Sequence, residues 1–144
     1  MPPHQQPEPI GLDVSRTGRL LSRAFDDELI AAGGSLPMWL IALTLKSGDH
    51  TMQRDIANAI GIEGATLTHH LGRMESAGLV VRRRLPGNRR SQVVELTEEG
   101  ERLFSSLLST VVAFDQRLCD GLDEGELDTL RDLLGRLRAN ITQH

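Results

Sequence analysis

The sequence lacks the features that several large classes of protein require. Its 144 residues include a single cysteine, Cys119, so an internal disulfide framework is excluded. The longest apolar runs fall far short of the ~20 residues that span a bilayer. The opening Met1-Pro2-Pro3-His4 lacks the charged segment and apolar run of a signal peptide. We therefore expect one cytoplasmic domain that does not associate with a membrane.

Motifs of the common enzyme classes and of metal sites are also missing. The sequence has no nucleophile elbow, P-loop or GxGxxG, and no paired carboxylates in an apolar setting. His69 and His70 are adjacent, with His50 nearby, but neighbours on a helix point about 100° apart and do not chelate one ion together. Cys119 falls among leucine and valine, which favours a buried, inert side chain over a redox sensor. We expect neither an enzyme nor a bound metal or cofactor.

Apolar residues recur at helical spacing over most of the chain. Residues 1–9 hold four prolines and predict a disordered or extended tail. A first helix is expected from Asp13 to about Ala32, and Ser35 is a suitable cap for a second helix. The remaining helices are expected behind caps at Thr51, Thr97 and Asp123 and over residues 64–77, with Gly61 supplying a sharp turn.

A strand pair follows the two helices that flank Gly61. Leu79 to Leu85 and Ser91 to Leu96 are the expected strands, joined by a Pro-Gly-Asn turn, and the hairpin as a whole carries five arginines. Helix, tight turn, helix and basic hairpin is the order of a winged helix-turn-helix. In that fold one helix enters the DNA major groove, and the hairpin reaches toward the backbone and minor groove. The predicted fold class is mainly α, with six helices and a small β-hairpin wing.

The net charge of −4 is unusual for a DNA-binding protein, but the charges are unevenly distributed. Residues 51–94 carry seven arginines against three acidic residues, which is a charge of +4. The other residues carry nine basic against seventeen acidic side chains, which is a charge of −8. A basic patch on an acidic body can still bind phosphate groups, because exposed charges beyond about 10 Å are largely screened at ~0.1 M salt.

The helix before the hairpin and the hairpin itself carry specific sequence features. Met74-Glu75 precedes Gly78-Leu79-Val80, and Arg90 precedes Val94, Leu96, Thr97 and Gly100. In these features residues 13–142 resemble the MarR family of bacterial transcription regulators. Two positions depart from the family pattern: Leu85-Pro86 stands where an Asp-Pro pair is frequent, and Asn88 stands where an acid forms a salt bridge to the wing arginine. The resemblance implies an obligate homodimer, a palindromic double-stranded operator and, often, release by a small aromatic or phenolic ligand.

The helix after Gly61 carries the candidate contacts to DNA bases. Thr66, Thr68 and His69 are expected on the face opposite its apolar residues, where hydroxyls and imidazole suit base edges. Gln53, at the start of the preceding helix, suits a phosphate contact, with a local cap interaction as the alternative. Arg73 could likewise reach a phosphate or pair with an acidic side chain. For the whole surface, the alternative is a solvated helix face.

The hairpin arginines are the candidate contacts to the DNA backbone and minor groove. Arg82, Arg83 and Arg84 point to alternating sides of a strand, so they cannot all face DNA. We assign Arg84, with Arg89 and Arg90 at the turn, to the DNA-facing side; a solvated hairpin is the alternative. A rival interpretation is a winged-helix protein-interaction module that does not bind DNA. Five arginines in nine positions disfavour it.

A ligand site for a salicylate-like aromatic acid is predicted on the first two helices. Arg16 and Arg19 lie one turn apart and can converge on a carboxylate. Trp39 stands near Leu36 on the second helix and could stack on an aromatic ring. The resemblance adds Val111, the matching position on the long helix after the hairpin. The alternative is that Trp39 belongs to the core and that both arginines are solvated or bound to acidic side chains.

The ends of the chain are predicted to form a homodimer. Residues 10–34 and 98–144 are the expected dimerisation segments, and residues 35–97 form the DNA-binding region between them. Helices with an apolar stripe that a compact winged-helix core cannot cover would bury it across a two-fold axis. The candidate interface residues share this property: Leu12, Leu118, Leu127, Leu130, Leu134, Leu137 and Ile141.

Overall fold

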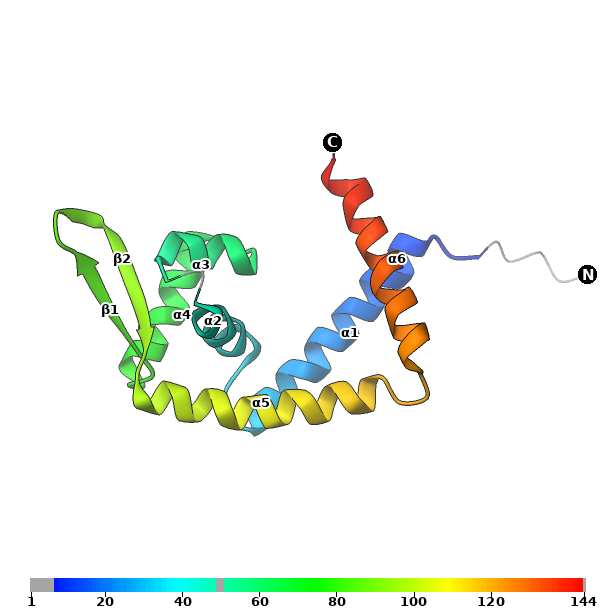
Figure 1. Ribbon diagram of the computed structural model, residues 1–144, viewed down its shortest axis with the longest axis horizontal. Helices are drawn as coiled ribbons and strands as arrows, with labels where there is room; N and C mark the ends of the chain where they lie inside the picture. The colour runs from blue at the N-terminus through cyan, green and yellow to red at the C-terminus, as the bar shows by residue number, and fades with distance from the viewer. Residues whose placement is uncertain (1–6, 49–50, 144) are drawn as a thin grey trace, which may run out of the picture. The chain divides into compact units, whose positions relative to one another are not determined.

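The computed structural model describes residues 7–48 and 51–143, with the backbone alone described at residues 88–90. The chain divides into two compact units, residues 1–111 and 112–144. The described residues form six helices and a hairpin, which confirms the expected fold class (Figure 1). The elements are α1 (Ile10–Ala31), α2 (Leu36–Ser47), α3 (Gln53–Ile60), α4 (Gly64–Ser76), β1 (Val80–Leu85), β2 (Asn88–Leu96), α5 (Glu98–Leu118) and α6 (Glu124–Thr142).

Helix α2 begins where the sequence predicts, and its first turn is held by two side chains. The Ser35 hydroxyl accepts a hydrogen bond from the Met38 amide at 3.3 Å, which is the expected cap. A carboxylate oxygen of Asp26, on α1, accepts from the Leu36 amide at 2.8 Å. Because this second bond comes from another helix, it also fixes where α1 and α2 meet.

Helix α2 lies between two apolar clusters of the first unit and contributes to both. Ile41 belongs to the cluster that holds α3, α4 and the hairpin together. Trp39 and Ala42 belong to the other cluster, with Leu29 of α1 and two residues of α5. The first cluster consists of Ile41, Ile56, Ala57, Leu67, Leu71, Met74, Leu79, Val80 and Val94.

The start of α3 differs from the prediction. Thr51 does not cap this helix, which begins at Gln53 after Met52 and has no side-chain cap. Instead the Thr51 carbonyl accepts a hydrogen bond from the Val94 amide at 2.8 Å, and Met52 bridges to Val93. Thr51 is therefore held against β2, which ties the start of α3 to the wing.

The hairpin is longer than the prediction in its second strand. β1 begins at Val80 and β2 already at Asn88, which pairs with Leu85. Only Pro86 and Gly87 separate the paired residues, and Gly87 has a φ of 84°, a conformation that glycine adopts at little cost. The tight turn extends the ladder toward the tip.

The junction between the wing and α5 depends on close backbone contact. Gly100 is buried in the first turn of α5, and a Cβ atom there would overlap the carbonyl oxygen of Leu79. The Thr97 hydroxyl donates to the Gly78 carbonyl at 2.5 Å and accepts from the Gly100 amide at 3.1 Å. Thr97 thus caps α5, as predicted, and joins it to the end of α4.

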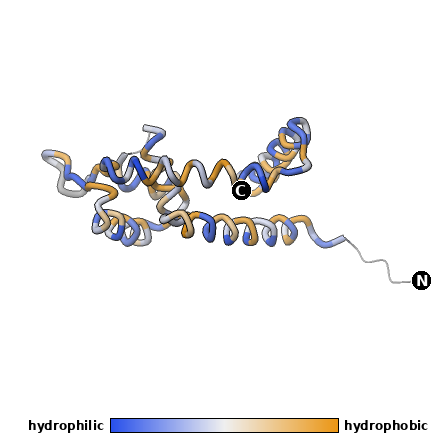
Figure 2. The backbone as a smooth tube through the Cα atoms, turned by 90° about the horizontal axis from the view of Figure 1, so that it is seen from below, coloured by the Kyte–Doolittle hydropathy of each residue, from blue (hydrophilic) through white to orange (hydrophobic). Residues whose placement is uncertain are grey.

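The second unit contains the end of α5 and all of α6. The predicted capping box is confirmed: Asp123 accepts from the Glu126 amide at 2.8 Å, and the Glu126 side chain accepts from the Asp123 amide at 3.1 Å. None of the α6 residues is buried, although apolar and polar segments alternate along the helix (Figure 2). Cys119 is half-buried in the single chain, whereas the sequence predicted a buried side chain.

Within the described ranges, no single helix is long and apolar enough to cross a membrane. The pair formed by α1 and α2 reaches the required length and composition only when taken together, and the two helices are bent by 84° at their junction.

The contact at Gly100 predicts a specific loss of stability. Gly100→Ala should destabilise the chain by roughly 2 kcal/mol or more, because the added methyl group meets backbone that cannot move aside. Gly72→Ala is the matched control: nothing lies within 4 Å of a Cβ atom there, and alanine in a helix interior should stabilise by about 0.5–1 kcal/mol. Thermal denaturation measures both changes. Equal effects of the two substitutions would contradict the close contact.

Candidate nucleic-acid interface

The turn between α3 and α4 sets which face of α4 meets solvent. Gly61 adopts a φ of 73°, and the Ile62 amide donates back to the Ala57 carbonyl at 3.1 Å, so the chain reverses sharply. The apolar stripe of α4 is then buried in the core: Leu67, Leu71 and Met74. The predicted contact residues are all exposed on the remaining surface of the helix: Thr66, Thr68, His69 and Arg73.

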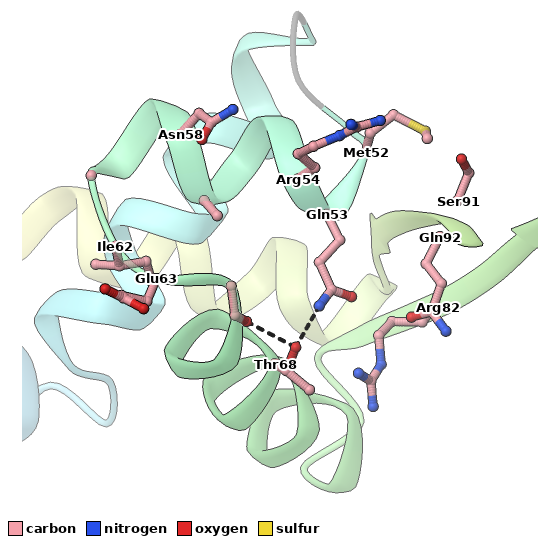
Figure 3. A pocket seen from close by; sticks show the side chains of 13 residues that line it. Met52, Gln53, Arg54, Asn58, Ile62, Glu63, Thr68, Arg82, Ser91 and Gln92 are labelled. Carbon is pink, nitrogen blue, oxygen red and sulfur yellow. Dashed lines mark hydrogen bonds between the residues drawn. The ribbon is translucent and has the colours of Figure 1, made fainter.

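A chain of hydrogen bonds connects α3 to α4 at this surface. The Gln53 side-chain amide donates to Thr68 Oγ1 at 2.7 Å, and the Thr68 hydroxyl donates to the Gly64 carbonyl at 2.9 Å (Figure 3). Gln53 therefore does not form the local cap that was the alternative. The structure brings two of the predicted residues together at the centre of the surface.

Two grooves meet at Thr68. The larger, of about 1140 Å³, is bordered by α3, the start of α4 and the hairpin, and its polar lining includes Gln53, Arg54, Arg82 and Gln92 (Figure 3). The smaller, of about 660 Å³, follows α4 past His69, Gly72 and Arg73. Both are open. Each is lined by polar or cationic side chains together with apolar atoms, and the acidic Glu63 also borders the larger groove.

Sequence reasoning missed some residues of the larger groove. Arg54 is exposed beside Gln53, and Gln92 of β2 faces the same space. The sequence could have indicated Arg54, because it lies in the first turn of α3, next to the phosphate contact predicted at Gln53. No signal in the sequence identifies Gln92, because its position in the groove depends on the register of the two strands.

The three arginines of β1 have different surroundings. Arg82 forms a two-bond ion pair with Glu75 of α4, with both nitrogen–oxygen distances at 3.2 Å. Arg83 pairs with Glu95 on β2. Arg84 is exposed and forms no ion pair with a described residue. The side chains of Arg89 and Arg90 lie outside the described part of the chain.

The ion pair between Arg82 and Glu75 joins the wing to α4. Hydrogen bonds from Arg82 hold the pKa of the Glu75 carboxyl below its ordinary value of 4.5, against a smaller opposing effect of burial. Sequence reasoning did not identify this pair, since its partners are seven residues apart on different elements. It places a fixed charge pair between the hairpin and the exposed face of α4.

The two adjacent histidines face different environments. Their rings lie 5.8 Å apart at 58°, and His69 is exposed while His70 is half-buried. Burial, followed by the charges of His69 and Arg73, lowers the pKa of His70 below 6.5. No group of three potential metal ligands exists among the described residues, and His50 lies outside them.

Comparison with known proteins agrees with this geometry. Residues 40–92 match the MarR family. The chain belongs to the MarR family. It is 33% identical over 97 residues to the uncharacterized HTH-type transcriptional regulator YdgJ of Bacillus subtilis (strain 168), a match that covers 67% of this chain and 59% of YdgJ. The predicted family is thereby confirmed.

Solved structures share the fold of this chain. A MarR-family regulator from Rhodococcus sp. RHA1 superposes with a TM-score of 0.79 at 26% identity, covering 89% of this chain and 91% of that protein. NadR in complex with 4-hydroxyphenylacetate superposes with a TM-score of 0.71 at 28% identity, covering 95% of this chain and 97% of that protein. The described fold is therefore the MarR fold from α1 to α6.

The residues predicted for a ligand site occupy two environments in this MarR-family chain. Trp39 is 5% exposed and stacks on Phe104, with ring centroids 5.1 Å apart. Leu36 and Val111 are half-buried against the same cluster. Arg16 is exposed and paired with Glu8, at 2.6 and 3.0 Å, and Arg19 is exposed on α1. Neither of the two grooves at Thr68 touches them.

The residues predicted for a dimer interface carry large exposed apolar surfaces. Leu12 on α1 is 53% exposed, and Leu118 at the end of α5 is 50% exposed. On α6, Ile141 is 78% exposed, and Leu130 and Leu137 are also exposed while Leu127 and Leu134 are half-buried. Five of these seven side chains are therefore exposed in the single chain.

The lowered pKa of Glu75 predicts a pH-dependent stability. A carboxyl whose pKa is depressed by folding stabilises above its ordinary pKa and loses that contribution as the pH falls through the folded value. Glu75→Gln should therefore lower the melting temperature at neutral pH, and the difference from the unmodified chain should shrink below about pH 4.5. The control is Glu95→Gln. It removes the ion-pair partner of Arg83, which is exposed to a similar degree but lies within the hairpin and does not join it to α4. A difference that stays constant with pH would show that Arg82 does not hold Glu75.

Proposed function

We propose that this chain is a sequence-specific DNA-binding transcription regulator of the cytoplasm, a repressor that a small aromatic acid releases from its operator. One observation carries the proposal: the exposed face of α4 presents hydroxyl, imidazole and guanidinium groups beside an arginine-bearing hairpin, while its other face is locked in the core. Helix α4 would lie in the major groove, with the hairpin on the adjacent backbone and minor groove.

Each candidate contact has a distinct role in this proposal. Thr66, Thr68 and His69 would meet base edges, and Gln53, Arg73, Arg84, Arg89 and Arg90 would meet phosphate or the minor groove. Arg82 and Arg83 are paired with acidic side chains, so they would position the wing rather than neutralise phosphates. A protein-interaction module is the second candidate, but Arg84 is exposed and has no ion-pair partner among the described residues, which supports DNA over protein.

A homodimer completes the proposal. The exposed apolar residues of α1, α5 and α6 would be covered by a second copy across a two-fold axis. The two copies of α4 would then bind the same face of a palindromic operator, with their centres one turn of DNA apart, ~34 Å. The dimerisation segments would be residues 10–34 and 98–144, with residues 35–97 as the DNA-binding region.

An aromatic acid would act by shifting the spacing of the two α4 helices. NadR, a structural neighbour at 28% identity, binds 4-hydroxyphenylacetate, and a similar ligand here would place its carboxylate near Arg16 and Arg19 and its ring near Leu36, Trp39 and Val111. Because Trp39 already stacks on Phe104, ring binding requires that this pair opens. The two α4 helices would have one spacing that fits the operator and another that does not. A ligand that binds the second spacing more tightly weakens DNA binding by that difference in affinity.

DNA binding through the wing predicts a change in salt dependence. Arg84→Ala and Arg90→Ala should each weaken binding to all sequences and lower the slope of log affinity against log salt by about one for each phosphate group that is no longer neutralised. Thr68→Ala or His69→Ala should instead reduce the preference for one sequence by ~1–3 kcal/mol. Gel shifts across a salt series measure both, with Arg131→Ala on α6 as the charge control. An unchanged slope in the wing variants would show that the wing does not touch DNA, and no complex at low salt would favour the protein-interaction module.

The dimer proposal predicts the effect of a charge on α6. Leu130→Asp or Leu134→Asp should give monomers or insoluble protein, because a buried carboxylate would be unpaired at the interface. Thr129→Asp, beside the apolar stripe, should stay dimeric. Sedimentation at micromolar concentration checks the result. A folded monomer of the unmodified chain would contradict the proposal.

The ligand proposal predicts coupled changes in fluorescence and DNA release. Salicylate-like acids should alter Trp39 emission and release the operator over the same concentration range. The double variant Arg16→Ala, Arg19→Ala should require at least tenfold more ligand, since it lacks a charge-assisted hydrogen bond worth about 1.5 kcal/mol or more. Arg23→Ala, one turn further along α1, is the control. Undiminished release from the double variant would place the ligand elsewhere.

A further inference from the structure

The hydroxyl of Thr68 has a fixed role at the centre of the α3–α4 surface. Its oxygen lies 2.9 Å from the Gly64 carbonyl oxygen, and since a carbonyl can only accept, the hydroxyl proton is used in that bond. The Gln53 side-chain nitrogen lies 2.7 Å from the same hydroxyl oxygen and must donate to it. A backbone carbonyl thus determines both the direction of the hydroxyl proton and the orientation of the Gln53 amide.

These two bonds leave Thr68 with acceptor capacity alone. A hydroxyl oxygen has two lone pairs; Gln53 occupies one, and the other remains open on an exposed residue that borders both grooves. Figure 3 shows two hydrogen bonds meeting at the Thr68 oxygen, one of them from the Gln53 side chain. A threonine without these bonds could rotate its hydroxyl to donate or to accept, and it would discriminate poorly between bases.

The DNA major groove offers few groups that an acceptor can bind. Adenine presents a donor at N6 and cytosine at N4, whereas guanine presents acceptors at N7 and O6 and thymine presents an acceptor at O4. We infer that Thr68 is a specificity-determining residue that reads the exocyclic amine of adenine or cytosine, and that Gln53 is the positioning residue that holds it in this state. The inference rests on the proposed binding of DNA through α4, and it adds the class of base.

The first step of the test is to select preferred duplexes from a randomised library with the full chain. Each adenine of the selected site is then replaced by purine, and each cytosine by 2-pyrimidinone, so that one exocyclic amine is removed at a time. At the base read by Thr68 the unmodified chain should lose about fivefold in affinity, the equivalent of one hydrogen bond. The same replacement should cost Thr68→Val nothing further. Purine and 2-pyrimidinone also weaken base pairing in the duplex. This effect cancels when the unmodified chain and Thr68→Val are compared on the same duplexes.

Three further variants separate recognition from a structural effect. Thr68→Ser should keep the sensitivity to the missing amine, because it retains the hydroxyl. Gln53→Met should bind with a weaker preference for the amine and tolerate guanine or thymine at that base, because without the Gln53 amide the Thr68 hydroxyl can rotate away from the Gly64 carbonyl and donate to the base. Thr129→Val removes a hydroxyl with the same bond to a carbonyl four residues earlier, at 2.9 Å from Gly125, and should leave the preference unchanged. Thr68→Ser and Gln53→Met also serve if Thr68→Val does not fold.

The outcomes distinguish this inference from the proposed function. Suppose that the chain binds a specific sequence, but that removing any one amine weakens the unmodified chain and Thr68→Val equally. This result would overturn the inference and leave the proposed function standing. A Thr68-dependent preference for guanine or thymine would do the same. An unmodified chain that forms no complex with any duplex, or binds all of them equally, would overturn both.

Discussion

Burial of one face of α4 is the constraint on which the rest of the site depends. Leu67 and Leu71 are fully buried, and Met74 is almost so, against residues of α2, α3 and the hairpin. Because residues three or four apart share one face of a helix, fixing these side chains directs Thr68 and its neighbours to solvent. Removing the apolar face would release the rotation of α4 and scatter the DNA-facing side chains, with no change in those residues themselves.

The arginines of the wing have two roles: some pair with acidic side chains and hold the hairpin in place, and others remain available to bind phosphate. Two of the three arginines on β1 are bound to acidic side chains, and the pair with Glu75 reaches across to α4. A partly exposed ion pair contributes only modestly to stability, so the main effect of this pair is to orient the wing. Asn88 stands where the family often has an acid, and the bond between Arg82 and Glu75 offers the wing of this chain a different anchor.

The sequence predicted the elements well and the contacts between them poorly. Helix periodicity, the Ser35 cap, the Asp123 capping box and the glycine turns are local signals, and the structure confirms them. The bond from Gln53 to Thr68 and the pair of Arg82 with Glu75 join separate elements, so local patterns do not show them. Thr51 failed as a cap because a tertiary bond to Val94 overrode the local preference. The predicted ligand and dimer residues stay predictions, since both depend on partners outside the single chain.

The central claim is that α4 lies in the major groove of DNA, once in each half of a dimer. Dimethyl sulfate methylation of a selected duplex tests it most directly, because the reagent modifies guanine N7 in the major groove and adenine N3 in the minor groove. The account predicts protection of guanine N7 in two patches about one helical turn apart, with adenine N3 protected only beside the wing. Protection of N3 alone, or a single patch of N7, would contradict it.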